Sequence, residues 1–200
     1  EVRRTQPMKR FAVVGHRAAT SGTFSLNDLA GSAGRMDVLC RCINASFFLS
    51  HDLRRDVECY LILCGEPGPE KTVLFSGSAL RYLSPDERSS AALVKKALAL
   101  PCGDEFREST PGVYVRRGGF TRLLAEVPFA VLDEAGEDIR AAPALPEAYL
   151  LSDHLNFTPE EEDLIAAYPR YSVGPRSLHA DHTITVLLNE MDRRESGWIS

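Results

Sequence analysis

The chain has 200 residues, of which 44% are hydrophobic and 26% are charged. This length and apolar content are enough for a buried core, which excludes a disordered protein. The formal net charge of -5 excludes a basic arm that coats nucleic acid through bulk charge, so any RNA site must be a local patch. Neither a membrane span nor a secretory signal pattern is present, so we expect a soluble, cytoplasmic protein.

The N-terminal part of the chain predicts a strand and then a helix. Residues 1–7 are polar and aperiodic, and we interpret them as an N-terminal extension before a single domain over 8–195 and a tail over 196–200. The first strand is expected at residues 10–14. A helix is expected within residues 32–49, because apolar residues recur there with the spacing of one buried helical face. These residues are Met36, Leu39, Cys40, Ile43 and Phe47.

The middle of the chain alternates between predicted strands and helices. Residues 56–64 and 72–75 have strand patterns on either side of a turn-rich segment. A capping box starting at Ser84, with proline at the first helical position, and a second one starting at Thr158 each predict the start of a helix. Short apolar runs typical of buried parallel strands follow at 130–132, 148–151 and 171–173. This alternation predicts an α/β domain.

The C-terminal segment combines a glycine-containing loop with a helix. Residues 183–186 are β-branched and favour a strand by propensity, but Ile184, Leu187, Leu188 and Met191 share one helical face. We therefore predict a helix, and we interpret its long apolar stripe as a dimer contact. The loop at Gly174 directly follows a predicted strand. Ligands of α/β sheets bind at the carboxyl ends of strands, so this loop is a candidate ligand site.

Six segments carry a resemblance to a known family. They read GRMDVLCRC (34–42), FFLSHDLRRDV (47–57), LSPDER (83–88), STPGVYVRR (109–117), SDH (152–154) and SVGPRSLHADH (172–182). Together they resemble the archaeal tRNA (pseudouridine-54) N1-methyltransferases of the SPOUT class, over residues 8 to about 194. The resemblance implies a SPOUT-type α/β fold with a parallel sheet core flanked by helices, a C-terminal trefoil knot around an S-adenosylmethionine site, and a homodimer.

The same resemblance implies a cofactor site formed by three loops. Loops suit this task, because methyl transfer needs the adenine held by backbone groups and the sulfonium turned toward the acceptor. The implied cofactor-binding residues are Leu132, Ser152, Val173, Gly174, Leu178 and Thr183. Several relatives have Gly in place of Ser152 and Cys or Ser in place of Thr183. Backbone contacts would survive both changes, whereas side-chain contacts would differ.

The implied methyl acceptor, N1 of pseudouridine, carries a weakly acidic proton that must leave. We expect Asp56 to orient or deprotonate it, with His51 as the second candidate and Arg35 as the third. A salt bridge or cap is the structural alternative for Asp56. Arginine suits phosphate geometry, so we expect tRNA contacts from Arg54, Arg55, Arg116 and Arg117, against the alternative of solvated surface charges.

Two further side-chain groups receive structural interpretations. The five cysteines, including Cys40 and Cys42, lie in apolar segments and are interpreted as buried thiols. Two cysteines two residues apart on a helix point in nearly opposite directions, so one metal ion could not easily bind both. His179 and His182, together with Asp153 and His154, match no standard metal-ligand spacing. We therefore expect no metal.

The function that these expectations support is N1-methylation of a pseudouridine in tRNA, at position 54, with S-adenosylmethionine as the cofactor. Two alternatives stay open at this point. One is a sister SPOUT enzyme acting on another RNA, such as ribosomal RNA. The other is a catalytically silent protein that binds RNA or senses the cofactor, which the negative net charge favours slightly.

Overall fold

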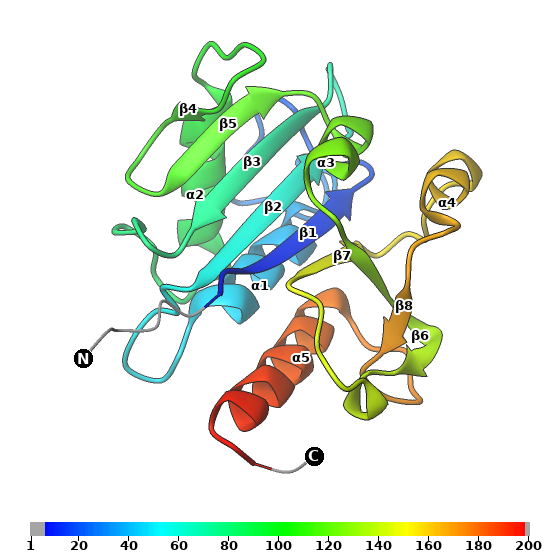
Figure 1. The fold of residues 1–200 in the computed structure, drawn as a ribbon. Coiled ribbons are helices and arrows are strands. Elements are labelled where there is room, and N and C mark those ends of the chain that lie inside the picture. The colour runs from blue at the N-terminus through cyan, green and yellow to red at the C-terminus, as the bar shows by residue number, and fades with distance from the viewer. Residues whose placement is uncertain (1–6, 199–200) are drawn as a thin grey trace.

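The computed structural model describes residues 7–198, and an eight-stranded sheet with helices on both faces forms its frame (Figure 1). The strands are β1 (Lys9–Gly15), β2 (Val57–Leu63), β3 (Lys71–Ser76), β4 (Arg107–Glu108), β5 (Val113–Arg117), β6 (Ala130–Asp138), β7 (Ala148–Ser152) and β8 (Arg170–Ser172). The helices are α1 (Met36–Phe47), α2 (Glu87–Leu98), α3 (Phe120–Glu126), α4 (Pro159–Ile165) and α5 (Ala180–Glu195), with a 3-10 turn at Ile139–Ala141. The predicted α/β fold is confirmed.

The sheet is mixed, with the strand order β4-β5-β3-β2-β1-β7-β6-β8. The five strands from β2 to β8 pair in parallel, whereas β3, β5 and β4 pair antiparallel at the other edge. The expected parallel sheet core therefore comprises five strands, and three antiparallel strands extend it on one side. The short segment 64–70 joins β2 to β3, and a connection of this length permits only an antiparallel neighbour, since a parallel one needs a crossover of a dozen or more residues.

Alternate residues of each strand pack on opposite faces of the sheet. Phe11 and Val13 face the core that includes α1, α2 and α5, whereas Ala12 and Val14 face the smaller core that includes α3 and Ile165 of α4. All of these strand residues are fully buried. Apolar residues on both faces explain why the central strands read as nearly continuous hydrophobic runs.

The long helices form where the periodicity predicts them. In α1 the five residues of the predicted apolar face are fully buried, and Arg41 pairs with Asp37 at 3.1 Å on the other side. In α5 the predicted apolar stripe is also buried, and α5 packs against α1 within the same chain (Figure 1). Interpreting this stripe as a dimer contact is therefore wrong, because the stripe is already covered by the chain's own core.

One predicted helix start is confirmed and one is wrong. At α4 the Thr158 hydroxyl accepts from the Glu161 N–H at 3.2 Å and the Glu161 carboxylate accepts from the Thr158 N–H at 2.8 Å, which completes the predicted capping box. At α2 the N-cap is Asp86, not Ser84, and its carboxylate accepts from the Ser89 N–H at 2.7 Å. The proline after Ser84 therefore lies before the helix.

The remaining expectations about the chain ends and thiols have simple outcomes. Residues 1–6 of the expected extension and 199–200 of the expected tail lie outside the described residues. The five cysteines are free thiols, and burial raises the pKa of Cys59 to about 12. No helix within residues 7–198 is long and apolar enough to cross a membrane. The trefoil knot stays a prediction.

Candidate functional site

A groove of about 660 Å³ lies beside the irregular middle of β6, the end of β7 and the segment after β8. Its volume falls in the range of roughly 300–1,000 Å³ that is typical of small-molecule sites. These three segments meet here because parallel strands point in the same direction and present their carboxyl ends at the same edge of a sheet. All six residues expected to bind the cofactor line this groove: Leu132, Ser152, Val173, Gly174, Leu178 and Thr183.

The groove has apolar and acidic lining residues. Leu132, Leu151 and Val173 provide apolar side chains, while Asp133 and Glu134 provide carboxylates directly after the buried part of β6. Arg170 of β8 pairs with Asp133 at 3.0 Å, which fixes that carboxylate beside the strand end. The groove can therefore contact both apolar and positively charged parts of a ligand.

The loop after β8 leaves its backbone open to the groove. A Cβ atom added at Gly174 would meet no atom within 4 Å. The turn itself is held by Ser172, whose hydroxyl donates to the Gly174 carbonyl at 2.5 Å and accepts from its N–H at 3.2 Å. A larger side chain at Gly174 would therefore project into free space, not into the fold.

The side chains of Ser152 and Thr183 bond to nearby backbone. The Ser152 hydroxyl donates to the Leu155 carbonyl, and the Thr183 hydroxyl donates to the His179 carbonyl at 3.2 Å. Both side chains thus stabilise the local backbone of the loops that line the groove. This arrangement favours backbone contacts to a ligand at these two positions.

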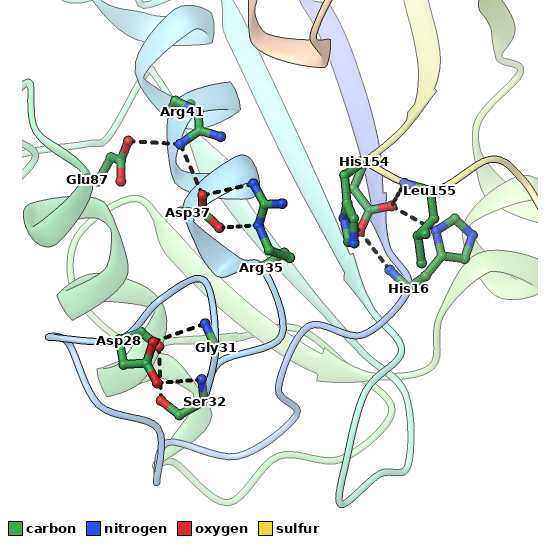
Figure 2. A network of polar contacts seen from close by, with 11 residues as sticks. His16, Asp28, Gly31, Ser32, Arg35, Asp37, Arg41, Glu87, His154 and Leu155 are labelled. Carbon is green, nitrogen blue, oxygen red and sulfur yellow. Dashed lines mark hydrogen bonds and ion pairs between the residues drawn. The ribbon is translucent and has the colours of Figure 1, made fainter.

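Arg35 also lines the groove, in an unusual backbone conformation. It is the N-cap of α1, and within residues 7–198 no other non-glycine residue has a positive φ, here 63°. Its guanidinium donates to both carboxylate oxygens of Asp37, at 3.0 and 3.2 Å (Figure 2). Backbone strain of this kind costs energy and persists where surrounding contacts fix the residue, often at functional sites.

Asp37 is the centre of a small charged network. It accepts from Arg35 and from Arg41, and Arg41 reaches Glu87 at 3.1 Å (Figure 2). Burial alone would raise the pKa of Asp37, but the hydrogen bonds and charges of the two arginines lower it below the usual value. Asp37 therefore stays ionised and holds the Arg35 guanidinium in one orientation at the groove.

Two of the three catalytic candidates lie near the start of β2, away from the groove. Asp56 directly precedes β2, and its carboxylate accepts from Lys9 at 2.9 Å, which also contacts Glu195 at 2.8 Å. His51 lies exposed in the loop between α1 and β2. Neither residue lines the groove, whereas Arg35 does. The structure thus brings one of the three catalytic candidates to the expected cofactor residues.

Three of the four arginines expected to bind RNA have partners inside the chain. Arg54 donates to both oxygens of Asp192 at 2.8 Å, and Arg55 donates to the carbonyls of residues 77 and 80. The buried Arg116 pairs with Glu126 and lies over the Phe106 ring, 4.3 Å from its centroid. Arg117 is exposed at the end of β5. None of the four lines the groove.

Several groove residues were missing from the predicted site, namely Asp133, Glu134, Asp153, His154, Tyr171, Arg176, His179 and His182. Most of them follow the predicted strands 130–132, 148–151 and 171–173 within a few residues. The rule that ligands bind beyond the carboxyl ends of strands would have identified them. Among residues 7–198 no group of three or more His, Cys, Asp or Glu side chains could hold a metal ion.

Comparison with known proteins gives the family. A family model described as "Putative SAM-dependent RNA methyltransferase" matches residues 8–196. The protein named tRNA (pseudouridine(54)-N(1))-methyltransferase of Methanocorpusculum labreanum is 61% identical, over 94% of this chain and 98% of its own. Its namesake from Methanospirillum hungatei is 52% identical, over 96% of this chain and 100% of its own.

A solved structure shares the fold. The crystal structure of Archaeoglobus fulgidus Nep1 bound to S-adenosylhomocysteine superposes with a TM-score of 0.63 and 13% sequence identity, over 96% of this chain and 100% of that one. This likeness supports the expected SPOUT-type α/β fold. The match of the family model over nearly the whole chain, and relatives at more than half identity, show that the chain belongs to this family of S-adenosylmethionine-dependent RNA methyltransferases.

Proposed function

We propose that this chain transfers the methyl group of S-adenosylmethionine to N1 of pseudouridine 54 in tRNA. The observation that carries the proposal is the groove, which gathers the six expected residues from β6, from β7 and from the segment between β8 and α5 with the first turn of α5, together with Arg35. The activity is the one named in the relatives at 61% and 52% identity, which match this chain over nearly its full length.

The side chains and backbone groups that line the groove fit this cofactor. Leu132 and Val173 offer apolar surface to an adenine, and the Gly174 carbonyl, which accepts from Ser172, has a second lone pair for a further donor. Asp133 and Glu134 offer negative charge to the sulfonium and ammonium groups. When bound, S-adenosylmethionine supplies an electrophilic methyl group, and the loops fix its direction, so that orientation provides a large part of the rate.

Arg35 is the proposed catalytic residue. Its guanidinium lines the groove, is oriented by two hydrogen bonds to Asp37, and is permanently charged. A positive charge at this place stabilises the negative charge that develops on the pseudouridine ring as its N1 proton leaves. This role is electrostatic, so a separate group accepts the proton.

Asp56 and His51 remain proposed proton acceptors. Both lie away from the groove of their own chain, so we propose that they act in the groove of a second copy of the chain. We call the end of the sheet where β1 and β2 begin, near Asp56, the amino edge, and the end where the groove lies the carboxyl edge. We propose a homodimer in which the amino edge of one copy meets the groove of the other. Val186, with 42% of its surface exposed on α5, is an apolar contact available to such a partner. Light scattering at micromolar concentration tests the assembly, and a monomer would contradict it.

The arginines that we propose to contact tRNA differ from those expected from the sequence. Because Arg54, Arg55 and Arg116 donate to partners within the chain, as Arg35 does to Asp37, we propose that Arg117 and Arg176 make most of the phosphate contacts. Arg35 and Arg176 both line the groove, which places positive charge beside the reacting base in this proposal. A cytoplasmic location is proposed together with the tRNA substrate and agrees with five free thiols.

A methyl-transfer assay tests the proposed function. Radiolabelled S-adenosylmethionine is incubated with two tRNA transcripts that differ only in carrying uridine or pseudouridine at position 54. We expect label only in the pseudouridine transcript. Label in a ribosomal RNA fragment in place of tRNA would favour a sister enzyme, and absence of transfer despite cofactor binding would favour a silent relative.

A further inference from the structure

His16 lies at the end of β1 with its ring between two carboxylates. Its Nδ1 is 2.9 Å from Oδ1 of Asp153, which follows β7, and its Nε2 is 2.6 Å from Oε1 of Glu161 in the first turn of α4. The side chains of these residues are 9%, 1% and 13% exposed. The bridge thus connects three elements at the carboxyl edge of the sheet.

The two contacts together specify the protonation state of the ring. Carboxylate oxygens only accept hydrogen bonds, and a neutral imidazole has one N–H. Both contacts are satisfied only when both ring nitrogens carry a proton. Burial alone would lower the pKa of His16, but the hydrogen bonds to Asp153 and Glu161 outweigh it and raise the pKa above its usual value.

The bridge holds the segment that forms one wall of the groove. Asp153 also accepts from the backbone N–H groups of His16 and Leu155, each at 3.1 Å (Figure 2). The oxygen of Glu161 that meets His16 also accepts from the Thr158 N–H at 2.8 Å. His16 therefore ties the two ends of segment 153–161, and residues 152–157 of this region line the groove.

We propose that His16, as an imidazolium, is a positioning residue for methyl transfer: it links Asp153 to Glu161 and thereby fixes the wall of the cofactor groove formed by residues 152–157. This inference rests on the proposed function, because it assigns His16 to the cofactor groove. His16 itself does not line that groove, so it acts through Asp153 and the loop that follows.

The surroundings of His16 determine how the bridge responds to pH. The other titratable or charged groups around the bridge are Arg17, Arg35, Cys64, Glu70, His154 and Glu160. The charges that raise the pKa of His16 come from Asp153 and Glu161, the two carboxylates in contact with its ring. Burial raises the pKa of the Cys64 thiol to about 12, so this group stays neutral.

Loss of the ring proton breaks one of the two contacts. A neutral His16 keeps one N–H, so its other nitrogen presents a lone pair to a carboxylate oxygen at less than 3 Å. The link between β1 and α4, or between β1 and β7, is then repulsive. The groove wall loosens as the pH rises through the raised pKa of His16, and cofactor affinity falls with it.

Three proteins compared by calorimetry with S-adenosylhomocysteine test this inference. For the wild type we expect Kd to rise by about three- to tenfold from about pH 6 to about pH 9, the effect of losing one charge-assisted hydrogen bond. Glu161→Gln should move the rise in Kd to lower pH, because it removes one of the two carboxylates that raise the pKa of His16, while the amide oxygen still accepts from the Thr158 N–H.

Glu160→Gln is the matched control. It removes the same charge one residue earlier in the first turn of α4, from a side chain that is exposed and is not part of the bridge to His16. We expect it to retain the pH dependence of the wild type. The ionisation of S-adenosylhomocysteine itself affects all three proteins equally. Differences between their profiles of Kd against pH therefore reflect the protonation of the His16 bridge.

Nuclear magnetic resonance of the ring nitrogens gives a second readout. We expect both nitrogens of His16 to be protonated at about pH 6 in the free protein. Unchanged wild-type affinity across the pH range, a rise in Kd at the same pH in Glu161→Gln as in the wild type, or a neutral His16 ring at about pH 6 would overturn the inference. Failure to bind S-adenosylhomocysteine at every pH would overturn the proposed function as well, so the two failures are distinguishable.

Discussion

The two edges of the sheet use charged side chains in different ways. At the amino edge Lys9 contacts both Asp56 and Glu195, and Arg54 donates to Asp192, so each charge is balanced by a partner from a distant part of the chain. At the carboxyl edge Arg35 is held by Asp37 yet still lines an open groove. The first arrangement fastens the C-terminal helix to the sheet, while the second leaves a charge available to a ligand.

This difference shows that a charged motif is not by itself a site. Arg54, Arg55 and Asp56 form a charged motif, but each of these side chains already has a partner within the chain. A guanidinium that already donates to two carboxylate oxygens has less capacity for phosphate. A charged residue near the carboxyl ends of parallel strands is a better indication of a ligand site than a charged motif in the sequence is.

The largest effect is expected from Gly174→Leu. A leucine side chain would enter the groove where a Cβ meets no atom, so we expect S-adenosylhomocysteine affinity to fall at least about 100-fold and its thermal shift to vanish. Stability without ligand should change by no more than about 0.5 kcal/mol. Gly103→Leu, where a Cβ also meets no atom, is the control and should retain the shift.

Arg35→Lys tests the charge at the carboxyl edge. Lysine keeps the charge but loses the two-pronged contact with Asp37, so we expect turnover to fall by roughly 10²-fold while cofactor affinity changes by less than about threefold. Arg41→Lys is the control, because Arg41 shares Asp37 but does not line the groove. Equal turnover in the two variants would contradict the role of Arg35.

Asp56→Asn tests the amino edge. Lys9 would keep Glu195 but lose one charged partner, so we expect the free energy of unfolding to fall by about 1–2 kcal/mol. If Asp56 accepts the N1 proton, as proposed, turnover per folded molecule should also fall by roughly 10²-fold. Turnover within about twofold of the wild type would instead remove Asp56 from the mechanism and leave it a structural ion pair. Chemical denaturation and single-turnover kinetics on one preparation separate these outcomes.

Arg54→Gln should have the smallest effect. The hydrogen bond from Arg54 lowers the pKa of Asp192 below its usual value, so the pair contributes stability above the ordinary pKa of a carboxyl group and loses it as the pH falls through the lowered value. Asp192 is partly exposed, and solvent screening limits the contribution to less than about 1 kcal/mol at pH 7. Denaturation curves of the two proteins should converge in acid, and a constant difference would contradict the assignment.

The sequence by itself determined most of the elements and the place of the groove. The periodicity of residues 36–47 and 184–191 predicted α1 and α5 because a buried helical face repeats within one element. The loops after the three short apolar runs, together with the family resemblance, gave six residues that do lie around one groove. These are local signals, since each depends on residues close to one another along the chain.

The tertiary structure alone decided how charged side chains pair and which face of α5 is free. Arg54 meets Asp192 across 138 positions, and His16 meets Asp153 and Glu161 across 137 and 145 positions. No local periodicity encodes such pairs, because they depend on how strands and helices are placed relative to one another. The apolar stripe of α5 likewise showed burial but not its partner, which is α1 of the same chain. Hydrophobic patterning specifies that a face is covered, and only the packing of the whole chain specifies by what.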